Sequence, residues 1–429
     1  MTRRAWWLVV LNFLLPGSAQ SLAGSRRLAR VGLTATLVMW LLVIAGVGVT
    51  LVSPAFLTSL MTNGFFLLLV QIVLLAYAIL WVVLTIDTLR LVRLVKLKPN
   101  ARPLVALLAI VGLVIGGGGV TYAAQQLIAP AREALASIFT NNDPPVPPSN
   151  GYYNFLLLGA DSGLGRDSMR FDSISVVSVN AETGGVHITG IPRDLAYAPF
   201  ADGPMHDLYP DGFEGHYSET CGWGPGINQL MNAVEICQED GGTGLYPDAA
   251  AHSSTPAIEA TKDAAEGILG IEIPYYVFVD MKGFADIGEP AEDWAIGWIE
   301  AGPQHMDGDT AQWYARSRYT TSDWDRMRRQ RELQQAILAQ ANPANVLLRF
   351  QQVAAAGEDL VQTDIPNGLL SFLVPLAAKA KELPVQTLEL TPEGAGIDTD
   401  EPTADEYAHV RDIVQQNLYP PSPSPTPEG

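Results

Sequence analysis

The chain has 429 residues, which is enough for one large or two ordinary domains together with membrane segments. Its formal net charge of −19 is divided unevenly. The first 130 residues carry ten basic side chains and one acidic one, whereas the remainder carries 16 basic and 44 acidic side chains. So acidic a remainder excludes nucleic acid as its partner, because polyanion binding normally needs a basic face.

The N-terminal region has the composition of a membrane domain. No charged residue occurs from Val31 through Ile86. This stretch predicts two membrane helices, at 31–52 and 64–86, and a third apolar run at 104–123 predicts another. Basic residues precede the first helix and separate the second from the third, so the positive-inside rule predicts a multi-pass plasma-membrane protein with an extracytoplasmic C-terminal part. A cleaved signal peptide fits poorly, because one apolar segment would suffice for it.

The pattern beyond the membrane region is typical of an α/β fold with a central mixed β-sheet flanked by helices. Apolar, β-branched runs predict strands at Tyr153–Gly159, Ser173–Val179, Gly185–Ile191, Tyr275–Val279 and Val385–Leu390. Helical periodicity predicts helices at 227–236, 256–269, 323–341, 346–356, 368–382 and 404–418, and a capping box of Ser322 and Asp325 begins the third of these.

Changes in composition predict the domain boundaries. Proline-rich stretches flank the acidic α/β region on both sides, and they are typical of linkers and disordered tails. The predicted parts are the membrane region 1–130, a juxtamembrane linker 131–150, an extracytoplasmic domain 151–340, an α/β extension 341–419 that packs on it, and a disordered tail 420–429.

Charged residues gather at the ends of the first three predicted strands. Asp161 follows the first strand, Arg170 and Asp172 precede the second, and Arg193 and Asp194 follow the third. Charged residues at strand ends indicate a site rather than a core. Carboxylate oxygens suit Mg²⁺ and arginine forks suit phosphate oxygens, so we expect Asp161 and Asp172 to bind Mg²⁺ beside a phosphate or pyrophosphate.

A second cluster of arginines lies between residues 316 and 331. Asp323, Arg326 and Gln330 share one face of the predicted helix. Arg316 and Arg318 point the same way if their segment is extended. Clustered arginine in an acidic domain indicates a local anion site. The alternative is a set of surface ion pairs, and it is the preferred interpretation for Arg328, Arg329 and Arg331.

The chain has two cysteines, Cys221 and Cys237, both in the acidic part. If that part is extracytoplasmic, one disulfide is the simple interpretation, and closing its short loop would contribute about 3 kcal/mol. The alternative is two free thiols. The six histidines are scattered and no His or Cys pair has zinc-ligand spacing.

In the two clusters of charged residues, the sequence resembles the LytR-CpsA-Psr (LCP) family of cell-envelope phosphotransferases. The motifs that carry the resemblance are LLLGAD (156–161), RFDSI (170–174), IPRD (191–194), RSRY (316–319) and DWDRMRRQ (323–330). INQLMNAV (227–234) and YYVFVDMKGF (275–284) also fit, and together these segments cover about residues 151 to 340. The sequence departs from the family after Phe284, where relatives usually continue with a D-A-L-G-G-V segment and another strand. This chain has ADIGEPAEDWAIGWIEAG at 285–302, and we expect a shortened strand there.

The resemblance implies transfer of a glycopolymer from a polyprenyl-pyrophosphate carrier to peptidoglycan. It also implies membrane lipid as a further partner. The implied catalytic residues are Asp161, Arg170, Asp172, Arg193 and Asp194. Arg170, Arg193, Arg316, Arg318, Asp323, Arg326 and Gln330 would bind or support the pyrophosphate, with Mg²⁺ on Asp161 and Asp172.

Several alternatives stay open at this point. Asp194 is either the base for the incoming hydroxyl or an ion-pair partner. The apolar segments 227–234 and 333–338 either line a slot for the lipid tail or belong to the core. A polyprenyl-pyrophosphate phosphatase would use the same site with water as acceptor, and a non-catalytic regulator would only hold an anionic glycolipid.

Overall fold

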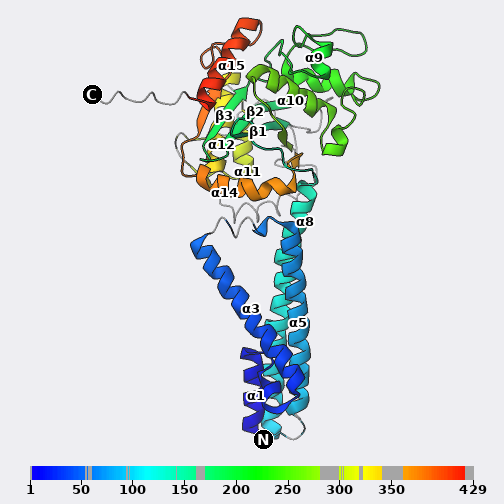
Figure 1. Cartoon of the computed structure of the whole chain (residues 1–429), viewed down its shortest axis with the longest axis vertical. Helices are drawn as coiled ribbons and strands as arrows, with labels where there is room; N and C mark the ends of the chain where they lie inside the picture. Colours follow the sequence, from blue (N-terminus) through cyan, green and yellow to red (C-terminus); the bar gives the residue numbers. More distant parts are fainter. Residues whose placement is uncertain are drawn as a thin grey trace, which may run out of the picture. The chain divides into compact units, whose positions relative to one another are not determined.

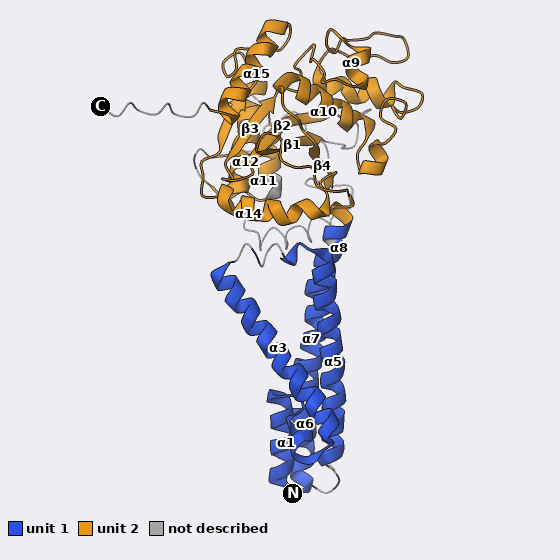
Figure 2. Cartoon of the chain, viewed as in Figure 1, with its two compact units in different colours: residues 1–136 blue, residues 137–429 orange. Residues whose placement is uncertain are grey.

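The computed structural model describes residues 2–53, 56, 60–92, 95, 97–141, 143–160, 170–280, 299–300, 302, 304–317, 322–340 and 361–420. The chain splits into two compact units, residues 1–136 and 137–429 (Figure 2). The helix predicted at 346–356 and nearly all of the divergent segment 285–302 lie outside the described residues.

The first unit is helical. Three of its helical stretches are long and apolar enough to cross a membrane, namely Arg26–Val52, Gly64–Val92 and Pro99–Ile138, the last of which ends two residues inside the second unit. The predicted spans fall within these stretches. The described helices are α1 (Thr2–Leu14), α2 (Ser18–Ala23), α3 (Arg26–Val52), α5 (Gly64–Val92), α6 (Arg102–Gly112), α7 (Gly119–Tyr122) and α8 (Ala129–Ile138), with π-helical turns at Leu113–Gly118 and Ala123–Ile128.

Buried polar contacts tie the first helices of this unit to α5. The Gln20 side-chain amide donates to the Leu84 carbonyl at 2.9 Å and to the Thr88 hydroxyl at 3.0 Å. The Asn12 amide donates to the Thr85 hydroxyl at 3.1 Å. An unsatisfied amide in an apolar bundle would cost several kcal/mol, so these bonds fix the packing of α1 and α2 on α5.

The second unit is built on a six-stranded mixed sheet with the order β5-β4-β1-β2-β3-β6. β1 is antiparallel to β2 and parallel to β4, while β3 is antiparallel to β2 and parallel to β6. The fold class predicted from the sequence is therefore confirmed. The strands are β1 (Tyr152–Ala160), β2 (Phe171–Asn180), β3 (Val186–Ile191), β4 (Tyr275–Asp280), β5 (Val361–Thr363) and β6 (Gln386–Glu389).

Helices cover both faces of this sheet (Figure 1). In β2, Ile174 and Val176 belong to the large core cluster, which also contains residues of α10 (Pro256–Leu269) and α15 (Ala404–Leu418). Val177 and Val179 instead pack with a smaller cluster that includes residues of two other helices. Successive strand residues point to opposite faces, so the alternation of apolar side chains produces three layers. The helices on the second face are α12 (Asp323–Gln340) and α14 (Leu370–Ala380).

Shorter helical elements complete the unit. The remaining α-helices among the described residues are α9 (Pro204–Leu208) and α11 (Gly308–Arg316). The segment predicted as a helix at 227–236 is helical throughout, but it begins as a 3₁₀ turn, Ile227–Gln229, and ends as a π-helical turn, Asn232–Ile236. Short 3₁₀ turns also lie at Ala249–His252 and Asn367–Leu369.

The C-terminal segment shares the sheet and the core with the earlier strands. β6 pairs with β3 along His187 to Gly190. The Tyr407 hydroxyl of α15 donates to the Ala196 carbonyl at 2.6 Å, and the Tyr152 hydroxyl of β1 donates to the Leu418 carbonyl at 2.8 Å. Within the described residues the core thus runs across the boundary predicted at residue 340.

The juxtamembrane segment also belongs to the second unit, from Ser137 onward. The Asn141 side-chain amide donates to the Asp364 carbonyl at 2.8 Å, and the Val146 amide donates to the Tyr275 hydroxyl at 2.7 Å. Part of the proline-rich stretch predicted as a linker is therefore bound to the domain at the start of β4.

Candidate functional site

The sheet brings the ends of four strands to one edge. Ala160, the last residue of β1, pairs with Phe171 at the start of β2 and with Asp280 at the end of β4. Ile191, the last residue of β3, pairs with Ile174 of β2. Arg170 and Asp172 at the start of β2 and Arg193 and Asp194 just after β3 therefore lie at this edge.

Arg193 lies at the centre of this edge and contacts three carboxylates. Its Nη1 donates to Asp172 Oδ1 at 2.6 Å and its Nε donates to Asp194 Oδ2 at 3.1 Å. The same Nε is 3.5 Å from Asp323 Oδ2, which comes from α12. Among the described residues, these contacts use Nε and Nη1 and leave Nη2 out. The side chain of Arg193 is 18% exposed.

The surroundings of Arg193 keep it charged. Burial of the guanidinium would lower its pKa, but the hydrogen bond that it donates to Asp172 and the charges of Asp194, Asp172 and Asp323 outweigh burial, and the pKa of Arg193 is raised. Guanidinium is the cation of choice for such partly buried ion pairs because it is weakly hydrated and bonds carboxylates in a fixed plane.

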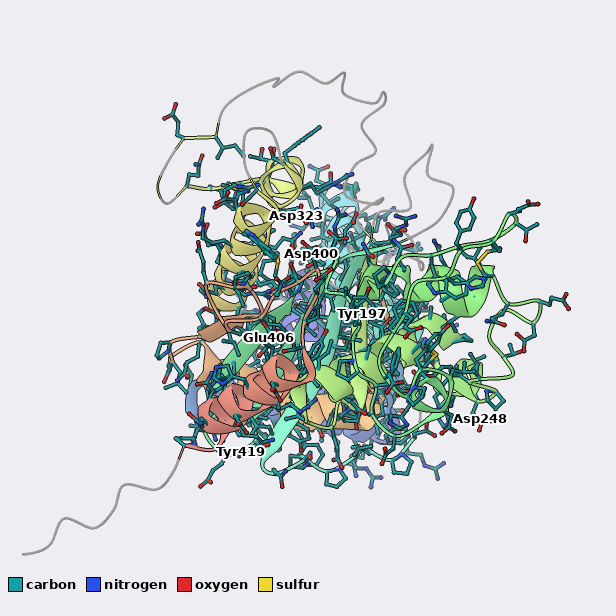
Figure 3. The ribbon with its side chains drawn as sticks, turned by 90° about the horizontal axis from the view of Figure 1, so that it is seen from above. Tyr197, Asp248, Asp323, Asp400, Glu406 and Tyr419 are labelled. Atoms are coloured by element: carbon teal, nitrogen blue, oxygen red, sulfur yellow. A yellow bond between two sulfur atoms is a disulfide. The ribbon has the colours of Figure 1, made fainter. Side chains whose placement is uncertain are left out.

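Helix α12 contributes Asp323 to the cluster around Arg193. Its N-terminus is fixed by the predicted capping box, which is confirmed: the Asp325 amide donates to the Ser322 hydroxyl at 3.1 Å and the Ser322 amide donates to Asp325 Oδ2 at 3.0 Å. Asp323 is the first residue of the helix (Figure 3), and Arg326 Nη2 donates to its Oδ2 at 2.9 Å. Arg326 is 4% exposed. Asp323 thus joins Arg193 of the strand edge to Arg326 of the helix.

A buried ion pair fixes the same helix to the sheet one turn further on. Arg331 Nε lies 2.7 Å from Glu389 Oε1 of β6, and the Arg331 side chain is only 7% exposed. The Gln334 side-chain amide donates to the Ser175 hydroxyl of β2 at 3.3 Å. The interpretation of Arg331 as a residue on a solvated face is therefore wrong, because its partner lies on a strand remote in sequence.

The other two arginines of this helix differ from one another. Arg328 pairs with Asp325 and is 66% exposed, as the surface interpretation predicts. Arg329 donates from Nε to the Tyr314 carbonyl at 2.8 Å and from Nη2 to the Ser317 carbonyl. It therefore binds the carbonyls at the C-terminal end of α11, a role in which a cation is favoured.

The remaining predicted site residues are placed less centrally. Arg316 is the last residue of α11, so the extended geometry considered for Arg316 and Arg318 does not hold at Arg316. Gln330 reaches the end of the same helix, where its amide donates to the Ala315 carbonyl at 3.4 Å. Arg170 is exposed, next to the first residue of β2. Asp161 and Arg318 lie outside the described residues.

Asn228 is a site residue that the sequence did not reveal. Its side-chain amide donates to Asp194 Oδ1 at 2.9 Å, and its backbone amide donates to the Arg193 carbonyl at 2.9 Å. The segment 227–234 suggested only an apolar slot or core, and the core interpretation fits the structure for Ile227 and Leu230, which are fully buried. A polar residue within an apolar run was the available signal.

The predicted magnesium pair is only half described. Asp172 lies at the edge with its side chain 15% exposed and presents carboxylate oxygens, which are the donors that Mg²⁺ prefers. Across the described residues no group of three or more His, Cys, Asp or Glu side chains has the arrangement of a metal site. Mg²⁺ usually takes one or two carboxylates and completes its shell with water and substrate phosphates, so the residues present fit such a site.

Cys221 and Cys237 are joined by a disulfide with a Cα–Cα distance of 5.7 Å. It lies in the long segment between β3 and α10, outside the charged edge (Figure 3).

Comparison with known proteins agrees with the motifs. Residues 294–417 match the sequence model of the LytR_cpsA_psr family. This part of the chain is therefore similar to the LytR-CpsA-Psr family. Among curated relatives, proteins named polyisoprenyl-teichoic acid–peptidoglycan teichoic acid transferase TagU, from Bacillus cereus and Bacillus mycoides, are 24% identical over 229 residues. The match covers 49% of this chain and 60% of each relative.

Solved structures are also similar to part of the chain. Bacillus subtilis TagV has 20% sequence identity and a TM-score of 0.40, over 62% of this chain and 97% of that one. A structure described as TagT bound to LIIa-WTA has 19% identity and a TM-score of 0.40, over 65% of this chain and 94% of that one.

Proposed function

We propose that this protein is a membrane-anchored, Mg²⁺-dependent phosphotransferase that moves a glycopolymer from a polyprenyl-pyrophosphate carrier to peptidoglycan. The observation that supports this most directly is the cluster around Arg193, in which two arginines and three aspartates from three segments converge on one edge of the sheet. The names of the curated relatives, which specify a polyisoprenyl-linked donor and a peptidoglycan acceptor, support the choice of substrates.

Phosphoryl transfer requires mainly that the reacting groups be positioned and their charge neutralised. Arg193 serves both needs. Its Nε and Nη1 are fixed by carboxylates, so its plane is set before the substrate arrives, and Nη2 would bind a phosphate oxygen. Arg326 supports this arrangement from α12 by holding Asp323 against Arg193.

Mg²⁺ would be held by Asp172 and Asp161, and when bound it would supply positive charge beside the phosphate oxygens. Arg193 holds the Asp172 carboxylate at the edge of the sheet, where the metal would bind.

Asp194 acts better as a support than as the general base. Oδ1 accepts from Asn228 and Oδ2 accepts from Arg193, so both oxygens are already engaged with donors. A general base needs an oxygen within hydrogen-bond reach of the proton that it takes, and here each oxygen already has a donor. We therefore assign Asp194 and Asn228 to the orientation of Arg193.

We also propose that the second unit lies outside the cytoplasm and that the anchor crosses the membrane more than once. The disulfide supports this location, because disulfides persist in oxidising compartments. A cysteine at exposed Leu208 should react with a membrane-impermeant maleimide in intact cells. Labelling only after lysis would refute the orientation.

The reaction is tested with the full-length chain, since residues 137–146 are part of the folded unit and a truncation near residue 145 would remove contacts of Asn141. Wild type, Asp172→Ala, Arg193→Lys and Arg328→Ala are compared with a polyprenyl-pyrophosphate glycan, peptidoglycan, and either Mg²⁺ or a chelator. Arg328 is the matched control because it is an exposed arginine on the same helix as Arg326.

We expect Mg²⁺-dependent transfer of the glycan to peptidoglycan by wild type and Arg328→Ala. Arg193→Lys keeps the charge but loses the planar fork, so its turnover should fall about 100-fold, as expected for one lost transition-state donor. Release of lipid phosphate without labelled peptidoglycan would favour the phosphatase. Tight lipid binding without turnover would favour the non-catalytic regulator.

A further inference from the structure

A cavity of about 420 Å³ lies in the second unit, at the end of the sheet where β4 begins. Its walls come from several segments: the juxtamembrane segment with Val146, the loop with Tyr246 and Asp248, the helix α10 and Tyr275, the first residue of β4. Sites for small molecules usually have volumes of about 300 to 1,000 Å³ and a few polar groups that converge on the ligand. The size of this cavity is therefore that of a ligand site.

The cavity is separate from the charged edge around Arg193. Tyr275 begins β4, whereas Asp280, which lies at the charged edge, ends it. At about 3.3 Å per residue the strand places these two residues about 17 Å apart. Asp248 of the cavity and Asp323 of the charged edge are likewise far apart in Figure 3. All the lining residues belong to the second unit, so the cavity does not depend on how the two units are placed.

The cavity carries more negative than positive charge. Four carboxylates line it, whereas Lys262 is the only lysine or arginine among the described residues that line it. Lys262 Nζ lies 2.9 Å from Glu259 Oε1 and 3.0 Å from Asp364 Oδ2, so two of the carboxylates already compensate its charge. The other two carboxylates, those of Asp143 and Asp248, leave the cavity with an excess of negative charge.

This lining fits an organic cation better than an anion or a metal ion. The excess of carboxylates would repel an anion. A metal ion is not favoured either, because the described residues contain no group of three or more His, Cys, Asp or Glu side chains that could hold one. Tyr246 and Tyr275 add aromatic rings, to which ammonium groups are attracted as they are to carboxylates. A carbon chain would also find apolar partners in the lining prolines, Pro144, Pro247, Pro274 and Pro366.

We propose that this cavity binds a small organic cation that carries a primary ammonium group on an alkyl chain. Asp248 is exposed and binds the ammonium group, and Tyr246 and Tyr275 pack against the alkyl chain. Asp143 has the smaller part, because its Oδ2 already lies 2.6 Å from His252 Nδ1. The same chemistry is found in a free alkyl diamine and in an amino-acid side chain that ends in an amine. The inference goes beyond the proposed transferase reaction and does not depend on it.

The test is isothermal titration calorimetry of the full-length protein in detergent, at neutral pH and low salt. The probes are cadaverine, a free diamine, and the amide of Nα-acetylated lysine, and pentanediol is the uncharged control ligand. We expect both amines to bind one site per chain and pentanediol to give no binding. Either order of affinity between the two amines supports the proposal, and the tighter one identifies the source of the ligand.

Three variants locate the binding. Asp248→Asn should raise Kd about fivefold, as expected for the loss of one partly screened ion pair. Val146→Trp should abolish binding by filling the cavity. The Val146 side chain is 45% exposed and its contact with Tyr275 is made by the backbone, so this variant should fold, which melting checks. Asp412→Asn is the matched control, because Asp412 is an exposed aspartate of α15 that does not line the cavity.

Asp412→Asn should bind both amines as wild type does. The proposal would be overturned if Asp248→Asn and Asp412→Asn had the same affinity, or if a folded Val146→Trp still bound cadaverine, since the general acidity of the unit would then account for the binding. It would also be overturned if neither amine bound the wild type.

Discussion

The ion pair between Arg331 and Glu389 offers the sharpest test of how the site is held together. Glu389→Ala leaves the Arg331 guanidinium buried without its carboxylate. Removing one partner of a fully buried pair costs 3–5 kcal/mol, but the Glu389 side chain is 25% exposed, so we expect about 2–3 kcal/mol. In a unit of this size each kcal/mol lowers Tm by about 2 °C, which predicts a decrease of about 4–6 °C.

The assay is calorimetric or fluorimetric melting of the full-length protein in detergent at fixed pH and salt. Arg328→Ala is the control, because the pair of Arg328 with Asp325 is exposed, and its loss should change stability by less than about 0.5 kcal/mol. The double substitution Arg331→Met with Glu389→Leu should recover most of the stability, because substituting both members of a buried ion pair by apolar residues changes the free energy of unfolding little. Equal melting of Glu389→Ala and Arg328→Ala would refute the reasoning.

Three further predictions concern other parts of the second unit. Gly190→Ala would place a Cβ against both Glu389 and Arg331, so melting of this variant should show a loss comparable to that of Glu389→Ala, and an unchanged Tm would contradict the packing. Burial raises the pKa of Asp263 to about 6, despite its hydrogen bond from Tyr246. The ionised form is therefore disfavoured in the folded state, and stability should fall as pH rises from about 4 to 6. Asp263→Asn should remove this fall and be more stable than wild type at pH 8 by about 1–2 kcal/mol after allowance for its partial exposure, as checked by melting across pH. Reduction of the disulfide, whose cysteines are 16 residues apart, should lower the free energy of unfolding in urea by about 3 kcal/mol. A decrease near zero would mean that the loop is already ordered without the disulfide.

Local patterns were sufficient to predict the central strands and the principal helices. α10 and α15 have the predicted bounds, because Thr255 and Thr403 cap their N-termini and each sequence has an apolar stripe. β1 to β4 lie within two residues of their predicted ends, since apolar runs and turn residues define them locally. The strand predicted at 385–390 exists as β6, but no local pattern could show that it pairs with β3.

The parts of the site that sequence could not provide depend on such distant pairings. Arg328 and Arg331 look equivalent in sequence, yet one is exposed and the other is buried against Glu389 of β6. Asn228 contacts Asp194 only because the long segment after β3 folds back on the strand edge. Charge type and spacing predicted which residues gather at the edge, whereas the pairing of strands decides which of them touch.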